Sequence, residues 1–222
     1  MTALPGAFVS GATIAEAWEQ GLRLFQTPAD LFRHDSERGV AFEITGMTMV
    51  VGSSEDLAAP ARYRFPGLVT DYTERLFGAD RDRSMLYQRM HNWPAPDGRM
   101  IDQIARLGEM LSMSPDTRAA TFTLWRPEDD LQSSFPVSPV SGCFRIIAGR
   151  LQLQLVARSV DYWVGAVAEL VAYGRLANEL AGKLRVMPGP IVFHMWSAHI
   201  YEDDCLAHVA SPGHTSLLRS GP

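Results

Sequence analysis

Three polar side chains stand together in the segment LVARSVDYWVG, residues 155–165. Arg158, Ser159 and Asp161 separate an apolar run with strand character, ending at Ala157, from an apolar run with helical character. If a helix begins near Ser159, its unpaired N–H groups and positive dipole end form an anion site with Ser159 as the N-cap. The planar guanidinium of Arg158 suits a phosphate. The alternative is an ordinary helix cap with a surface salt bridge.

Two carboxylates lie within the apolar sequence that follows. Asp161, Gly165 and Glu169 recur every four residues, so we expect them on one stripe of the helix. Carboxylates in a buried helix need partners, because an unpaired buried charge is costly. A pyrimidine is one candidate partner, since a carboxylate can accept a hydrogen bond from the amino group of cytosine. The alternative is an ion pair between Glu169 and an arginine such as Arg175.

A histidine and a tyrosine come near the end of the last apolar run. His199 and Tyr201 are two residues apart on an expected strand, so they point to the same face. An imidazole beside a phenol could hold sugar hydroxyls. The alternative is a pair of core residues whose polar atoms are satisfied within the protein.

The composition sets bounds on the class of protein. The chain has 222 residues, 46% of them apolar and 20% charged, as expected for one large globular domain. The formal net charge of -5 weighs against a nucleic-acid partner. Two cysteines, Cys143 and Cys205, form no disulfide framework and favour a reducing compartment. We expect no signal peptide, membrane span or metal, and a cytoplasmic location.

The order of hydrophobic patterns predicts a mixed α/β (α+β) fold with a largely antiparallel sheet. A hairpin is expected over 142–159, with Ala148-Gly149 as its turn, and a long buried helix over 160–184. Residues 53–100 read as loops around a short helix. The remaining expected elements are helices over 13–26 and 97–113 and strands over 40–52, 118–125 and 189–201.

Three segments carry a resemblance to a known family. NWPAPDGRMIDQI, GRLQLQLVARSVDYWVG and AHIY resemble the thymidylate synthase family, which includes the deoxycytidylate and cytidylate hydroxymethylases. The resemblance runs without a gap from Trp93 to Tyr201, is looser over 36–52 and hardly extends to 53–85. It implies a sheet-centred homodimer, a single domain over 1–222, and a site for a pyrimidine nucleoside monophosphate and a reduced folate.

The resemblance also implies roles for individual residues. Arg118 matches the first of two arginines that reach the phosphate in the partner subunit, whereas the second position is Ala119. The remaining implied roles are phosphate binding for Arg38, Arg158 and Ser159, ribose binding for His199 and Tyr201, the polar network around base and folate for Asp161, and the catalytic water network for Tyr87.

Several positions depart from the family pattern. The base-reading asparagine of the family falls at Glu169, and the hydroxymethylases have an aspartate there, so an acidic residue favours cytosine over uracil. Ala157 replaces a glutamine. Ser138-Pro139 stands where the family has its nucleophilic cysteine followed by histidine. Cys143, five residues on, is expected to face the opposite side as a small core residue.

The serine at position 138 leaves the chemistry open. Cysteine is partly thiolate at neutral pH, whereas a hydroxyl needs an adjacent base, and no histidine follows Ser138. Three explanations remain: an engineered replacement of cysteine, a reaction that uses Ser138 or another chemistry, or nucleotide binding without turnover.

The favoured function is pyrimidine C5 one-carbon transfer with 5,10-methylenetetrahydrofolate, above all hydroxymethylation of a cytidylate (CMP or dCMP). The alternative is a nucleotide-binding homologue that is catalytically silent or uses non-folate chemistry. Family members continue beyond the histidine-x-tyrosine motif into a segment that closes over both ligands, and we expect that segment to be missing here. We therefore expect the nucleotide-binding half of the site to match the family pattern better than the folate-binding half.

Overall fold

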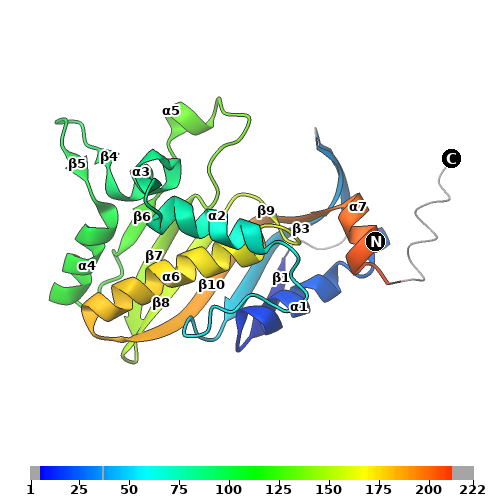
Figure 1. Cartoon of the computed structure of the whole chain (residues 1–222), viewed down its shortest axis with the longest axis horizontal. Coiled ribbons are helices and arrows are strands. Elements are labelled where there is room, and N and C mark those ends of the chain that lie inside the picture. The colour runs from blue at the N-terminus through cyan, green and yellow to red at the C-terminus, as the bar shows by residue number, and fades with distance from the viewer. Residues whose placement is uncertain (1–5, 37, 212–222) are drawn as a thin grey trace.

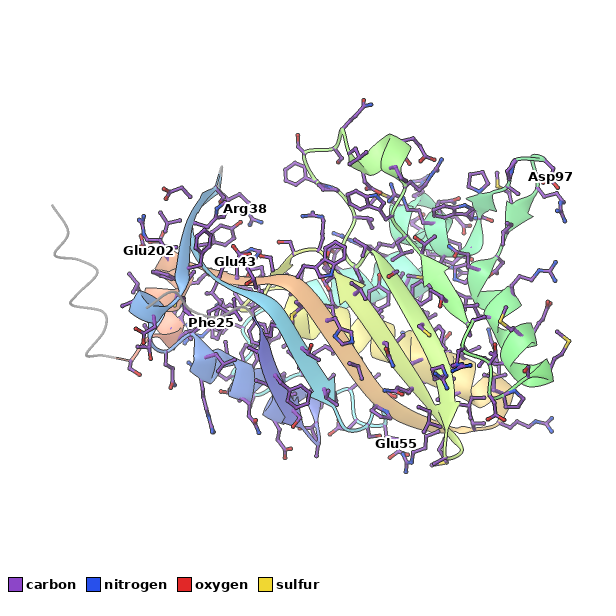
Figure 2. All side chains as sticks on the ribbon, turned by 180° about the vertical axis from the view of Figure 1, so that it is seen from behind. Phe25, Arg38, Glu43, Glu55, Asp97 and Glu202 are labelled. Atoms are coloured by element: carbon purple, nitrogen blue, oxygen red, sulfur yellow. The ribbon has the colours of Figure 1, made fainter. Side chains whose placement is uncertain are left out.

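A mixed eight-stranded sheet forms the centre of the molecule. The structure is a computed structural model and describes residues 6–36 and 38–211. The helices lie on one face of the sheet (Figure 1), and the view from behind shows the other face without a covering helix (Figure 2). The expectation about a missing closing segment concerns the end of the chain, where residues 212–222 lie outside the described residues.

The sheet combines parallel and antiparallel pairs, as the sequence predicted. Its order is β1-β3-β10-β8-β7-β6, with β2 paired to β3 and β9 paired to β10. The pairs β1–β3, β8–β10 and β9–β10 are parallel and the other pairs are antiparallel. The strands are β1 (Ala7–Gly11), β2 (Phe32–Ser36), β3 (Gly39–Val51), β6 (Thr121–Thr123), β7 (Ser141–Ile147), β8 (Arg150–Ala157), β9 (Val160–Asp161) and β10 (Met187–Tyr201), besides a separate small ribbon of β4 (Trp93–Pro94) and β5 (Met100–Ile101).

The β7–β8 hairpin confirms the predicted turn. Ala148 and Gly149 both have positive φ, 50° and 73°, and connect strands that pair from Ile147 with Arg150. Two positive φ values match the twist of the flanking strands, which is why a glycine is favoured here. Along β8 the leucines are buried against the helices, and Gln152 and Gln154 point to the uncovered face.

The helices place the core on one side of the sheet. The long helix α6 is buried along most of its length and packs against α2, β8 and β10. Figure 1 shows α2 and α6 lying across the same face. The helices are α1 (Ile14–Leu24), α2 (Pro66–Phe77), α3 (Met85–His91), α4 (Gln103–Met113), α5 (Pro127–Asp130), α6 (Ala166–Leu184) and α7 (Glu202–Asp204), with 3-10 turns over Pro28–Asp30 and Arg81–Arg83 and a π-turn over Cys205–Val209.

The expected start of the long helix near Ser159 is wrong. Helix α6 begins at Ala166, with Gly165 as its N-cap. Before it, β9 pairs with β10, so that Asp161 lies opposite His199, and the backbone N–H of Tyr162 donates to His199 O at 2.7 Å. Ser159 is therefore not a helix cap, and Asp161 does not share a helical stripe with Glu169.

Three smaller expectations need correction. Residues 53–100 contain two α-helices, α2 and α3, rather than one. The helix expected over 97–113 begins at Gln103, where the carboxylate of Asp102 accepts from Ala105 N at 2.8 Å. Cys143 is half-buried on the uncovered face of the sheet rather than part of the core.

Candidate functional site

Most of the polar residues predicted from the sequence line one cavity of about 820 Å³. It lies at the carboxyl ends of the parallel strands β8 and β10. The β2–β3 hairpin and the loop after α5, which rise from the same edge of the sheet in Figure 1, both contribute to its wall. The predicted site residues that line it are Arg38, Ser138, Arg158, Ser159, Asp161, Glu169, His199 and Tyr201.

Arg158 connects the end of β8 to the loop after α5. Its Nε and Nη2 donate to Pro136 O at 3.2 and 2.6 Å, and Nε also reaches Val137 O at 3.2 Å. Burial lowers the pKa of the guanidinium, because taking a cation out of water disfavours its charge. Arg158 therefore places a positive charge on the cavity wall and also fixes the loop that carries Ser138.

A second cation comes from the β2–β3 hairpin. The guanidinium carbon of Arg38 lies 5.0 Å from the centre of the Tyr201 ring, a cation–π distance. Figure 2 labels Arg38 near the tip of this projecting hairpin. Arg38 and Arg158 thus reach the same cavity from different parts of the sheet, as two donors for one anion would have to do.

His199 and Tyr201 are neighbours on the cavity wall. Their ring centres are 5.3 Å apart in an edge-to-face arrangement, consistent with side chains two residues apart on one strand. His199 Nδ1 lies 3.4 Å from Ser159 Oγ, and burial lowers the pKa of His199 to about 4. The imidazole is therefore neutral at physiological pH and can both donate and accept.

Ser138 lines the cavity without an adjacent base. Its hydroxyl donates to the backbone oxygen of Ser159 at 2.9 Å, and the Ser138-Pro139 bond is cis. Among the described residues, no histidine or carboxylate is hydrogen-bonded to the Ser138 hydroxyl. The structure therefore fixes the position of this serine, but no side chain of the described residues is bound to it as a base.

Glu169 is the most buried acidic side chain of the cavity. It is 4% exposed, and its Oε2 has no hydrogen-bond partner among the described residues. Burial raises its pKa to about 8, an effect that Tyr72 on α2 and the charge of Arg158 offset only in part. The alternative pairing with Arg175 is wrong, because Arg175 Nε binds Glu179 at 3.2 Å.

Asp161 differs from Glu169 in having a local partner. Its Oδ1 accepts from Val164 N at 3.0 Å, which fixes the turn leading into α6. Burial raises its pKa to about 6, above its usual range. At neutral pH the cavity therefore contains one ionised carboxylate, Asp161, and one that keeps its proton, Glu169.

A buried ion pair supports the loop that carries Ser138. Arg89 Nη1 lies 2.6 Å from Asp130 Oδ2, and the two side chains are 6% and 2% exposed. Asp130 also accepts from Arg126 N at 2.7 Å and Val137 N at 3.0 Å. Although burial raises the pKa of Asp130, these hydrogen bonds and Arg89 hold it below its usual value. The pair fixes the residue that directly precedes Ser138.

Two predicted site residues lie elsewhere. Tyr87 lines a different cavity, where its ring stacks on His91 at 4.4 Å, and its helix neighbour Leu86 faces the candidate site instead. Adjacent residues on a helix point about 100° apart, so a shift of one position changes the face. Arg118 is exposed ahead of β6 and does not line the cavity of its own chain.

Sequence reasoning missed the contribution of α2. Leu68, Tyr72 and Arg75 all line the cavity, and Tyr72 faces Glu169. Their spacing of four and three residues is that of one helical face, and Pro66 marks the start of the helix. That periodicity could have identified this helical face from the sequence, although the region has hardly any family resemblance.

Within residues 6–36 and 38–211, no group of three or more histidine, cysteine, aspartate or glutamate side chains is placed to hold a metal ion. No helix within this part of the chain is long and apolar enough to cross a membrane.

The cavity combines groups that suit different parts of one ligand. Arg38 and Arg158 offer positive charge, His199 and Tyr201 offer neutral polar atoms, and Glu169 offers a buried carboxyl. Residues 79–210 match the family model for thymidylate synthase. This match covers more than half of the chain and includes most of the cavity, and the observed mixed sheet with its long helix is compatible with the fold of that family. The chain therefore belongs to the thymidylate synthase family, whose general chemistry is one-carbon transfer to C5 of pyrimidine nucleotides.

Proposed function

We propose that the protein binds a pyrimidine nucleoside monophosphate in the 820 Å³ cavity and transfers a one-carbon unit to C5 of its base. The observation that carries this proposal is the convergence of eight predicted residues, from four separate stretches of the chain, on one cavity. Arg158, Ser159 and Arg38 would bind the phosphate, and His199 and Tyr201 the ribose. Glu169 would face the base, with Asp161 in the polar network beside it.

The finer form of the proposal is folate-dependent hydroxymethylation of a cytidylate, CMP or dCMP. An acceptor oxygen of Glu169 can receive a hydrogen bond from the N4 amino group of cytosine, and once the carboxyl is ionised O4 of uracil would oppose it as a second acceptor. The apolar side chains of Leu68, Leu86 and Phe135 line the cavity near these polar groups and suit the flat ring of a reduced folate. When bound, 5,10-methylenetetrahydrofolate would supply the one-carbon unit.

In this reaction class a nucleophile adds to C6 of the pyrimidine and makes C5 electron-rich. The family resemblance implies that Ser138 would take the place of that nucleophile, and Arg158 and Asp130 hold its loop in place. The hydrogen bond from Ser138 to the oxygen of Ser159 aligns the hydroxyl but does not activate it. This observation favours a second candidate, a homologue that binds the nucleotide without turning it over.

We also propose that the protein is a homodimer through the uncovered face of the sheet. Trp196 is 60% exposed there, and Arg145 Nε is buried without a hydrogen-bond partner among the described residues. A second copy on this face would cover Trp196 and could offer Arg145 an acceptor, and a closed twofold contact would bring Arg118 to the partner's phosphate site.

The test is incubation of the protein with CMP, dCMP or dUMP and 5,10-methylenetetrahydrofolate, followed by mass spectrometry of the nucleotide. A product heavier by CH2O, as expected when a hydroxymethyl group replaces the hydrogen on C5, and absent with Ser138→Ala, supports the proposed transfer. Ser138→Cys should raise the rate, because a thiolate needs no adjacent base. Binding of nucleotide by calorimetry with no product from any combination would leave only the second candidate.

A further inference from the structure

The surroundings of Glu169 bear on which base the cavity accepts. The side chain is 4% exposed, and Oε2 is left without a hydrogen-bond partner in the described part of the chain. The cation whose charge lowers the pKa of Glu169 is Arg158. Its Nε and Nη2 donate to the carbonyl oxygens of Pro136 and Val137. No ion pair compensates the carboxyl within the described residues, and its free oxygen belongs to a side chain that lines the cavity.

Tyr72 is the polar side chain from α2 that acts on this carboxyl. A phenol can donate or accept a hydrogen bond, and a protonated carboxyl has one O–H donor and one acceptor oxygen. If Tyr72 donates to one oxygen, the other can carry the proton and donate into the cavity. If the proton faces Tyr72 instead, the free oxygen accepts. A neutral Glu169 beside Tyr72 can therefore present either a donor or an acceptor.

The two pyrimidine bases differ in this respect at position 4. Cytosine has an amino donor there, and uracil has an oxygen acceptor. We propose that Tyr72 and Glu169 together read either base, and that loss of the Glu169 proton restricts the site to cytosine. The inference rests on the proposed function, because it requires a pyrimidine nucleotide in this cavity. Tyr72 acts in it as a positioning residue, through Glu169.

None of the charged and titratable groups that face Glu169 changes its own charge between pH 7 and pH 9. They are Tyr72 on α2, Tyr63 ahead of α2, Tyr173 on the next turn of α6, and Arg158. The pKa values of all three tyrosines are raised above their usual value. The main cause is burial for Tyr63 and Tyr173 and the negative charge of Glu169 for Tyr72. All three tyrosines therefore stay neutral. Burial sets the pKa of Glu169 at about 8, against about 6 for Asp161 and about 4 for His199 elsewhere on the wall.

The experiment is calorimetric titration of the full chain with UMP and with CMP at pH 7, 8 and 9. In this range the nucleotide phosphate is already a dianion. With a midpoint near 8, the protonated fraction of Glu169 falls about tenfold between pH 7 and pH 9, so the Kd of UMP should rise about tenfold. The affinity for CMP should not fall.

Glu169→Gln is the matched control, because its amide has the same size and does not titrate. In this variant the pH dependence of UMP binding should vanish, and whatever dependence remains reports ionisation of the nucleotide itself. Tyr72→Phe should move the midpoint of the UMP dependence to higher pH, since the interaction with Tyr72 lowers the pKa of Glu169. A residue with only a packing role would leave that midpoint unchanged.

The outcomes separate the inference from the function it rests on. Equal, pH-independent binding of UMP and CMP would overturn the inference and leave the nucleotide site standing. A UMP dependence of the same size in Glu169→Gln as in the wild type would also overturn it. Failure of both nucleotides to bind at any pH would overturn the proposed function itself.

Discussion

Replacement of Glu169 by glutamine should change how the stability of the free protein depends on pH. Burial raises the pKa of this carboxyl from 4.5 to about 8, so the folded protein holds a proton that the unfolded chain has lost. Where the folded state binds more protons, stability falls as pH rises. The contribution of Glu169 is complete below about pH 4.5, declines above it, and is lost once pH has passed about 8.

The size of this effect follows from the difference in pKa. Each pH unit between the two values is worth about 1.4 kcal/mol. Between pH 6 and pH 8 the free energy of unfolding should therefore fall by about 2 kcal/mol on account of Glu169, after allowance for partial ionisation near pH 8. In Glu169→Gln this decline should be absent, because the amide stays neutral.

Urea denaturation at half-unit intervals from pH 6 to pH 8.5 would measure the difference between the two proteins. Asp161 and His199 also titrate in the cavity, but they are present in both proteins and their contributions cancel. Glu179→Gln serves as a second control, because this glutamate lies on the same helix and its side chain is 45% exposed beside Arg175. Parallel stability curves for the wild type and Glu169→Gln would refute the argument that Glu169 is buried as a neutral acid.

Three further changes test the phosphate site, the loop and the dimer. Arg158→Lys keeps the charge but loses the planar fork, so nucleotide affinity should fall about tenfold by calorimetry while affinity for the nucleoside stays the same; an equal loss for both would contradict the phosphate assignment. Asp130→Ala leaves the buried Arg89 with only Asp129 as an acidic partner, 3.4 Å away, and removes the acceptor for Arg126 N and Val137 N, so it should destabilise the protein by about 3 kcal/mol in urea denaturation; a loss below about 1 kcal/mol would show that the pair does not support the loop. Trp196→Glu should convert a dimer into a monomer in sedimentation experiments at micromolar concentration, and a wild type that is already monomeric under these conditions would rule out the proposed interface.

The parts of the fold that local pattern determines were predictable from the sequence. The hairpin over 142–159 and its Ala148-Gly149 turn were predicted, and the structure has both, with the leucines of β8 on its buried face. The start of α6 was not predictable in this way. Val160 and Asp161 have the composition of a helix start, but they pair with Ala198 and His199, and such long-range pairing leaves no local signal.

The site shows the same division between local and distant causes. Residues in motifs, such as Arg158 and His199, could be assigned to one cavity before the structure was known. Tyr87, which the resemblance assigned to the catalytic water network, lines a different cavity, because its helix α3 turns Leu86 toward the candidate site instead. Tyr72 was missed because its relation to Glu169 depends on how α2 packs on α6, and helix packing follows from the whole surface of both helices.

The unpaired oxygen of Glu169 lowers the stability of the protein when no ligand is bound. An unsatisfied buried polar atom destabilises a fold by about 1–3 kcal/mol, and an apolar residue of similar size on α6 would avoid that loss. Tyr173, one helical turn further on, also has a buried hydroxyl without a partner among the described residues. Buried polar atoms without partners are expected mainly at functional sites. The unpaired oxygen of Glu169 belongs to a side chain that lines the cavity with the predicted residues. A bound pyrimidine would give Glu169 its missing partner. Nucleotide binding should therefore stabilise the wild type by more than phosphate contacts alone provide, and Glu169→Leu should stabilise the free protein while it weakens binding.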